Sequence, residues 1–208
     1  MTTTRTLTPA EFDALREVGN IGVGNATTAL SKILNKKIAI NIPETKFVKI
    51  EKFSNELGGA ENIVMSLYLS FSGDLSGQCL FAFEEKDALE IVDLMMGQNV
   101  GTSKKFGSME ESAFMEMSNI FTGAYLSALA NMLSMRIMPS VPNIANDMVQ
   151  SVADLMLIKI SRAADELLCV KAKILVDGHN INGKFIILFD DASLDKVLKY
   201  LRTEYGLE

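Results

Sequence analysis

The chain has 208 residues, 48% of them hydrophobic and 22% charged, which are ordinary values for a globular protein of one large or two small domains. The formal net charge is −6 and no basic patch stands out, which argues against binding to nucleic acid or to an anionic membrane. No apolar run is long enough for a signal peptide or a membrane span. Cys79 and Cys169 both lie in apolar, strand-like runs typical of a core. We therefore expect a cytoplasmic protein without a disulfide framework.

The first predicted helix begins near residue 9. The sequence 8–11, Thr-Pro-Ala-Glu, is typical of a capping box with proline at the first helical position. Apolar residues then recur at nearly helical spacing as far as Leu34. A short β-rich run, 38–42, and then Pro43 follow, so we expect a helix and a short strand.

About a hundred residues later the same order of signals returns. The sequence 108–111, Ser-Met-Glu-Glu, is typical of a second capping box, and a helical pattern continues to Leu133. A strand-like run at 136–141 and then Pro142 follow. The chain therefore contains an internal repeat.

Each half continues with a predicted β-hairpin and a short amphipathic helix. In both hairpins the second strand begins at a glycine and ends at an acidic residue. The predicted strands are 62–71 and 76–84 in the first half and 167–176 and 182–190 in the second, and the predicted helices are 86–96 and 192–202. The polar, glycine-containing segment 98–107 is predicted to join the halves.

These signals predict one α+β domain over residues 1–208, built from repeats at 8–97 and 108–205 around a pseudo-two-fold axis. Neither repeat has much to cover its own sheet. We therefore expect the two hairpins to share one antiparallel sheet, with the two long helices packed on it.

The stretch 143–160 has no clear counterpart in the first repeat. The spacing of Val149, Val152 and Leu155 predicts a helix, and the run 157–160 predicts a strand after it. We expect this segment to be specific to the second half.

The two long helices carry the same polar face. In each, four positions at spacings of four, three and four residues lie on one side of the helix, and a proline follows the asparagine after 22 intervening residues. The sets are Asp13, Glu17, Asn20, Gly24 and Pro43 in the first half, and Ser112, Glu116, Asn119, Gly123 and Pro142 in the second. One such pattern arises easily by chance, whereas two matched copies do not.

A purely structural explanation exists for each part of this face. A carboxylate and an amide three residues apart are often only a solvated helix surface. Neighbouring positions nevertheless differ between the copies, Arg16 against Met115 and Gly22 against Phe121, while the Glu, Asn and Gly are the same. Glycines in the first helix either allow it to pack on its own sheet or leave bare backbone for a partner.

The Glu-x-x-Asn pair has the chemistry of a positioning device. An amide donates and accepts hydrogen bonds, and a carboxylate can bind an ammonium group. The pair offers no strong nucleophile, and the single histidine, His179, lies in a turn-like sequence without other ligands nearby, which disfavours a zinc site or a serine–histidine triad. Phosphoryl transfer requires chiefly alignment and charge neutralisation, so such a pair could hold a water in line while another protein supplies the metal and the cations.

The signature Asp/Ser-x-x-x-Glu-x-x-Asn, 22 residues, Pro resembles that of the CheC, CheX and FliY phosphatase family, and the sequence 17–26 is especially similar to CheC. The resemblance spans essentially the whole chain. It implies dephosphorylation of phospho-CheY, whose aspartyl phosphate and Mg²⁺ lie on CheY, with no cofactor bound by this chain.

The resemblance also implies residue roles and a second partner. Glu17 and Glu116 would anchor the partner through its lysine, and Asn20 and Asn119 would orient the attacking water. Asp13 and Ser112 occupy a variable position with a supporting role, Pro43 and Pro142 would be structural, and the receptor deamidase CheD would bind elsewhere on the surface.

Three other functions stay open at this point. The protein could be a CheD adaptor or a phospho-CheY-binding protein with little turnover. It could be a flagellar-switch component of the FliM or FliY kind, although the first helix begins near residue 9 and the chain ends soon after the last predicted helix, where such proteins carry further segments. A small-molecule phosphatase is disfavoured because the sequence offers no metal ligands or nucleophile of its own.

Overall fold

The computed structural model describes residues 8–49, 52–159, 166–176 and 179–206. Its strands form one antiparallel seven-stranded sheet in the order β1-β6-β7-β3-β2-β4, with β5 also paired to β2. The strands are β1 (Ile38–Lys49), β2 (Ile63–Gly73), β3 (Gly77–Phe83), β4 (Ile137–Pro139), β5 (Asn143–Met148), β6 (Glu166–Val176) and β7 (His179–Phe189). The predicted class, α+β with a shared antiparallel sheet, is confirmed.

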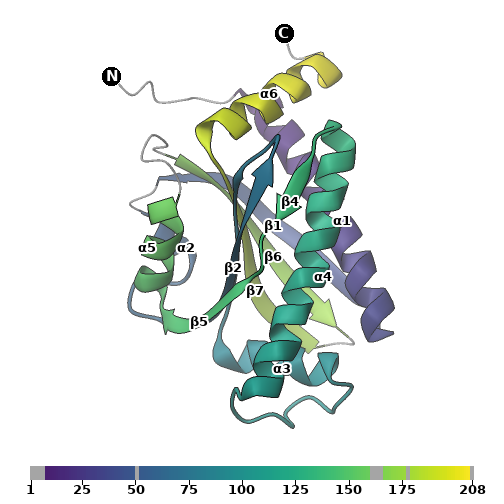
Figure 1. The fold of residues 1–208 in the computed structure, drawn as a ribbon, viewed down its shortest axis with the longest axis vertical. Helices are drawn as coiled ribbons and strands as arrows, with labels where there is room; N and C mark the ends of the chain where they lie inside the picture. Colours follow the sequence, from purple (N-terminus) through teal and green to yellow (C-terminus); the bar gives the residue numbers. More distant parts are fainter. Residues whose placement is uncertain (1–7, 50–51, 160–165, 177–178, 207–208) are drawn as a thin grey trace.

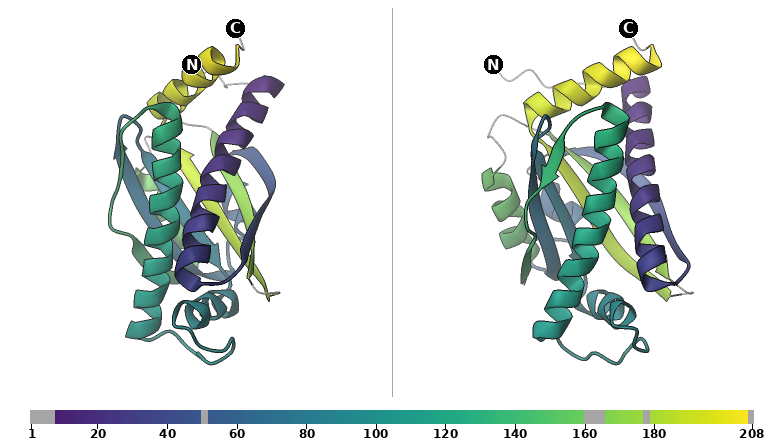
Figure 2. Two further views of the ribbon diagram at one scale, coloured as in Figure 1. Left: turned by 90° about the vertical axis from the view of Figure 1, so that its right-hand side faces the viewer. Right: turned by 45° about the vertical axis from the view of Figure 1, so that its right-hand side comes forward.

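Helices cover both faces of the sheet (Figures 1 and 2). The helices are α1 (Pro9–Leu34), α2 (Phe53–Glu56), α3 (Glu85–Met95), α4 (Ser108–Leu133), α5 (Val149–Lys159) and α6 (Asp191–Tyr205). The two long helices α1 and α4 lie side by side on one face, and α3 and α6 lie at opposite ends of this layer. The short helices α2 and α5 lie together on the other face.

The pseudo-two-fold axis passes between β3 and β7, the second strands of the two hairpins. Leu80 pairs with Ile186, and these two residues are equivalent in the alignment of the repeats. The strand ends mirror each other, since Gly77 pairs with Phe189 while Phe83 pairs with Gly183. The equivalent strands therefore pair with each other across the axis.

The strands that follow the long helices are exchanged between the halves. β1 pairs with β6 of the second hairpin, whereas β4 and β5 pair with β2 of the first. Each hairpin therefore obtains its outer neighbour from the other half. This arrangement gives a physical reason why neither half completes a sheet by itself.

The strands that follow the two long helices differ from their predicted bounds, since β1 is longer than predicted and β4 is shorter. β1 continues through Pro43 to Lys49, and its register shifts between Asn41 and Glu44, so the proline lies where the ladder is irregular. In the second half the equivalent of this strand is broken into β4 and β5, with the buried Pro142 in the break. The segment 143–148 thus does have a counterpart in the first half, contrary to our expectation.

Other local predictions need smaller corrections. The second capping box is shifted by one residue, because Gly107 is the N-cap and its N–H donates to the Glu110 carboxylate at 3.0 Å. The helix predicted from Val149 is present, but residues 157–159 continue it instead of forming a strand, and residue 160 lies outside the described residues. His179 begins β7 opposite Val176, so it belongs to a strand and not to a turn.

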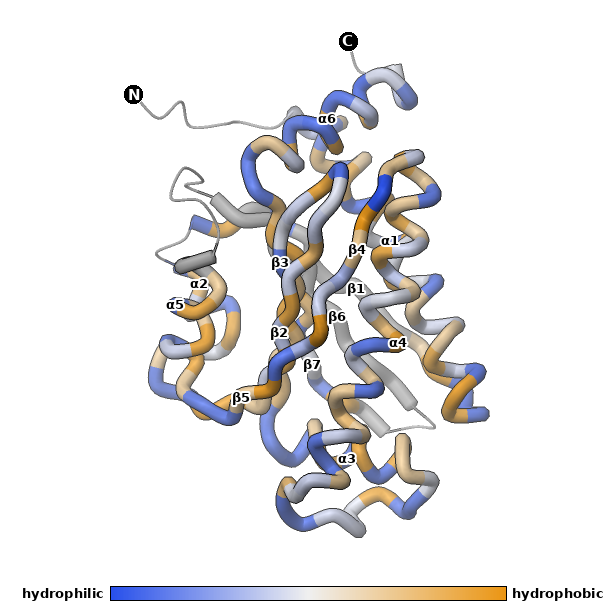
Figure 3. Tube along the Cα trace, viewed as in Figure 1, coloured by the Kyte–Doolittle hydropathy of each residue, from blue (hydrophilic) through white to orange (hydrophobic). Residues whose placement is uncertain are grey.

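Two apolar clusters hold the layers together. The larger lies between the sheet and the helices α1, α3, α4 and α6, and contains a group of mutually packed rings that includes Phe81, Phe121, Tyr125 and Phe185. The smaller lies between the sheet and the pair α2 and α5. Figure 3 shows the apolar segments along the central strands and on the helices that face them. Cys79 is a buried free thiol of the larger cluster, as expected, and burial raises its pKa.

The segment 98–107, predicted as the joint, connects α3 to α4 and is organised by one carboxylate. Asp93 is buried near the end of α3 and accepts hydrogen bonds from the backbone N–H groups of Gly101, Thr102 and Ser103 at 2.7 to 2.9 Å. Burial by itself raises the pKa of Asp93, but the hydrogen bonds outweigh it and the pKa is lowered. The repeat boundaries at 8–97 and 108–205 stay a prediction.

Candidate functional site

The layer formed by α1 and α4 presents the predicted site residues. The N-terminus of α1 contacts α6 through Glu11 and Arg202, and the C-terminal turn of α4 contacts α6 through Met132, whose carbonyl accepts a hydrogen bond from the Tyr200 hydroxyl at 2.6 Å. The start of α1 and the end of α4 thus meet the same helix. The two long helices are therefore antiparallel neighbours (Figure 2).

Gly22 sets the contact between these helices. A methyl group at this position would lie 2.5 Å from Cε2 and 2.6 Å from Cδ2 of Tyr125 on α4. The buried glycine therefore accommodates an aromatic ring of the neighbouring helix. Of the two explanations offered for the helix glycines, internal packing is correct for Gly22, although the contact is with α4 and not with the sheet.

The two Glu-x-x-Asn pairs point to solvent. Glu17, Asn20, Glu116 and Asn119 are all exposed, and none of them belongs to the buried positions of α1 and α4. Within the described part of the chain, none of these four side chains makes a hydrogen bond or an ion pair. Their functional groups are therefore available to another molecule without breaking an internal contact.

The geometry of the helices fixes the spacing of these groups. The Cβ atoms of residues three apart on a helix are about 5–6 Å apart, so each pair can contact one partner site. Because Gly22 is level with Tyr125 and the helices are antiparallel, Asn20 and Asn119 are about 12 Å apart along the axes, at about 1.5 Å per residue. The structure therefore brings the pairs onto one surface as two separate sites.

Gly24 and Gly123 behave differently from Gly22. A Cβ built on either residue would meet no atom within 4 Å. Packing within the protein therefore does not require glycine at these two positions. Bare backbone beside each Glu-x-x-Asn pair remains consistent with close approach of a partner.

The supporting positions differ between the two helices. The Asp13 carboxylate pairs with the Arg16 guanidinium at 3.1 Å, and both side chains are more than half exposed. On α4 the Ser112 hydroxyl donates to the Ser108 carbonyl at 2.8 Å, which is a contact within the helix. Pro43 lies at the register shift of β1 and Pro142 in the break between β4 and β5, and their structural role stays a prediction.

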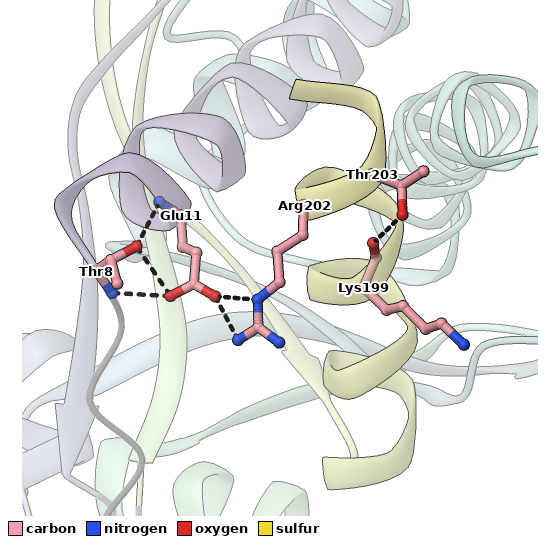
Figure 4. Close-up of polar contacts among 5 residues, drawn as sticks. All are labelled: Thr8, Glu11, Lys199, Arg202 and Thr203. Carbon is pink, nitrogen blue, oxygen red and sulfur yellow. Dashed lines mark hydrogen bonds and ion pairs between the residues drawn. The ribbon is translucent and has the colours of Figure 1, made fainter. Parts of the chain in front are cut away.

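A buried ion pair that the sequence did not reveal anchors the start of α1 (Figure 4). The Glu11 carboxylate accepts hydrogen bonds from the Thr8 N–H at 2.8 Å and from Arg202 Nε at 2.7 Å. The carboxylate is buried while Arg202 is half exposed. Burial raises the pKa of Glu11, but the hydrogen bonds from Thr8 and Arg202 outweigh it and the pKa is lowered. The capping box predicted the first contact, whereas nothing local in the sequence predicted the second.

Over the described residues, no cluster of three or more His, Cys, Asp or Glu side chains is placed to hold a metal ion. No helix in that part of the chain combines the length and hydropathy required to cross a membrane.

Comparisons with known proteins show which family the chain belongs to. The family model described as the CheC-like family matches residues 11–46, which include the first Glu-x-x-Asn pair. The protein named CheY-P phosphatase CheC from Bacillus subtilis (strain 168) is 31% identical over 191 residues, covering 90% of this chain and 91% of the relative. The chain belongs to the CheC family.

Solved structures share the fold of this CheC-family chain. The crystal structure of Thermotoga maritima FliY matches with a TM-score of 0.81 and 22% identity, over 96% of this chain and 100% of that one. The FliM middle domain from H. pylori matches with a TM-score of 0.65 and 14% identity, over 93% of this chain and 99% of that one. At these identities the likeness concerns the fold alone, so the function rests on the surface groups and on the relationship to CheC.

Proposed function

We propose that this CheC-family protein hydrolyses the aspartyl phosphate of phosphorylated CheY-type response regulators. The observation that carries the proposal is the pair of exposed, unpartnered Glu-x-x-Asn sites at equivalent positions of α1 and α4. The identity of 31% to a protein named CheY-P phosphatase CheC, over nearly the full length of both chains, supports the choice of substrate.

Each pair has a defined role in this reaction. Glu17 or Glu116 accepts the ammonium group of a lysine on the regulator and fixes the two proteins relative to each other. Asn20 or Asn119 holds a water through its amide, in line with the bond between phosphorus and the aspartyl oxygen. The water oxygen bonds to phosphorus, the bond to the aspartate breaks, and inorganic phosphate and a free carboxylate are formed while a proton passes to solvent.

The regulator supplies the remaining groups. By the family resemblance, Mg²⁺ and cationic side chains on the regulator would neutralise the phosphoryl oxygens, and we propose that this chain binds no cofactor of its own. CheD is proposed as a second partner on the family resemblance alone, and no described surface is assigned to it. The net charge of −6 fits a protein that binds a partner with an exposed basic face and neither nucleic acid nor membrane. We propose that it acts in the cytoplasm.

The test is the decay of phosphorylated CheY in the presence of single and double variants. We expect Asn20→Ala and Asn119→Ala each to lower the rate, and the double variant to lose nearly all activity, because neither amide has an internal contact to lose. Asn25→Ala and Asn131→Ala are matched controls, since both asparagines are exposed on the same helices outside the pairs. An unchanged rate in the double variant would refute the mechanism.

The molar ratio of this protein to the phosphorylated regulator distinguishes catalytic turnover from simple binding. At a small molar fraction of protein to regulator, a phosphatase still dephosphorylates the whole pool. A CheD adaptor or a regulator-binding switch protein with little turnover would affect only a stoichiometric part of the pool. This second result would assign a binding role to the same surface.

A further inference from the structure

The two Glu-x-x-Asn pairs are surrounded by different side chains. The residues one turn and two turns before a helical position, at i−4 and i−7, lie on the same face as that position. Around Glu17 and Asn20 these places hold two charged side chains and an alanine, and around Glu116 and Asn119 they hold a serine and two methionines. The identical pairs are therefore presented in unlike surroundings.

Charged groups flank the first pair. Asp13 is four residues before Glu17, and Arg16 is four residues before Asn20. Their side chains are 65% and 55% exposed and are joined at 3.1 Å. An exposed ion pair of this kind contributes about 0.2–1 kcal/mol, so a partner can exchange these contacts for its own at little cost.

Apolar groups flank the second pair. Met109, seven residues before Glu116, is 67% exposed, and Met115 stands where α1 has Arg16. Methionine is flexible and polarisable, which suits adaptable contact with a protein surface. The position equivalent to Met109 in α1 is Ala10, so the first site has no such group.

We infer that the two sites recognise the regulator through different contacts: Asp13 and Arg16 make charge contacts at the first site, and Met109 makes apolar contacts at the second. The inference rests on the proposed function for its partner, a phosphorylated CheY-type response regulator. The charged groups at the two sites have the same sum, because Asp13 and Arg16 cancel and each site keeps one glutamate. The difference therefore lies in short-range contacts and not in long-range attraction.

This equality of charge permits a clean experiment. The double change D13S/R16M, which introduces a serine and a methionine as at the second site, leaves the net charge unchanged, so any effect comes from contacts. It is made in the Asn119→Ala protein, which keeps only the first site. We expect KM for the phosphorylated regulator to rise about five-fold with kcat unchanged, the size expected for two exposed charge contacts.

The second site is tested in the Asn20→Ala protein. There Met109→Ser is expected to raise KM several-fold with kcat unchanged. Met138→Ser is the control for the loss of an exposed methionine, at 54% exposure. For the first site, Lys32→Met in the Asn119→Ala protein removes a cation elsewhere on α1 and shows how much a change of one unit in net charge contributes by itself. Thermal unfolding of each variant excludes misfolding as the cause.

For comparison, D13S/R16M and Met109→Ser are each made in both single-site proteins. The inference is overturned if each change alters KM equally in the two proteins, or if neither change alters KM in the protein that keeps its own site. Binding to the regulator activated by beryllofluoride, a stable mimic of the aspartyl phosphate, is measured on the same variants. If turnover is absent but the dissociation constants change as expected for KM, the proposed function fails and the inference stands. If neither turnover nor binding responds, the inference fails as well.

Discussion

Replacement of single glycines in α1 tests which side of the helix packs against the rest of the protein and which side is open to a partner. A methyl group at Gly22 would lie 2.5 Å from the Tyr125 ring, closer than Cβ atoms are found in proteins, so the helices must separate or the ring must move. Such overpacking costs about 1–3 kcal/mol, and the gain in helix propensity returns about 1 kcal/mol. The net expectation is that Gly22→Ala is destabilised by up to about 2 kcal/mol, with no gain in stability from the added methyl group.

Gly24→Ala is the matched variant two residues away. Its methyl group would meet no atom within 4 Å, so the propensity gain of up to about 1 kcal/mol is retained. In a protein of this size a change of 1 kcal/mol shifts Tm by about 2–4 °C, and thermal and urea unfolding can both resolve it. We also expect Gly24→Ala to weaken binding of the phosphorylated regulator, because the partner approaches the bare backbone there.

The signs of these two stability changes show whether Gly22 is tightly packed and whether Gly24 is open to solvent. A Gly22→Ala protein that is more stable than the original would show that the contact with Tyr125 is not tight. A Gly24→Ala protein that is destabilised would show that its surroundings are not open. A stabilised Gly24→Ala protein with unaltered binding would refute the role given to the bare backbone.

Three further predictions concern buried polar groups. Arg202→Met leaves the buried Glu11 carboxylate without its cation and should lower the free energy of unfolding by about 1–2 kcal/mol, less than for a fully buried pair because Arg202 is half exposed. The pKa of Glu11 is lowered in the folded protein, so its contribution to the free energy of unfolding is present above the ordinary carboxyl pKa and is lost as the pH falls through the lowered value. Urea unfolding between neutral pH and about pH 3 should therefore show that Arg202→Met loses less stability in acid than the original protein does. Asp93→Asn turns an acceptor of three N–H groups into a partial donor and should cost about 2–3 kcal/mol, with faster amide hydrogen exchange at Gly101, Thr102 and Ser103 as the local readout.

The sequence predicts those parts of the fold that local chemistry determines. The capping box at Thr8 and Glu11 marks the start of α1, and an acidic residue follows the last residue of both β3 and β7. Glycine marks the start of β3 only, because β7 begins at His179, before the predicted start at residue 182. Helical periodicity gives the length of both long helices, because each has one buried face throughout. The site residues could be grouped for the same reason, since spacings of three and four residues determine a common helix face.

Long-range pairing could not be predicted in this way. The exchange of β1 and β5 between the halves depends on which hairpin edge is free, and no single segment encodes that. β5 was missed because its residues, 143–148, are mostly exposed or half-buried in an edge strand and show no strong alternation. Arg202 is 191 residues from Glu11, so only the packing of α6 on α1 brings them together.

The buried and exposed positions of the two long helices have diverged differently, and this supports a function for the exposed ones. At buried positions the repeats differ: Gly22 and Ala26 of α1 stand where α4 has Phe121 and Tyr125. The small Gly22 makes room for the Tyr125 ring of the neighbouring helix. Packing therefore explains why the two repeats differ at this buried position. The side chains of the Glu-x-x-Asn pairs are exposed and make no hydrogen bond or ion pair within the described residues, so packing gives no reason for them to be the same. A carboxylate and an amide kept one helix turn apart on both helices, with open glycine beside them, are explained by what binds from outside.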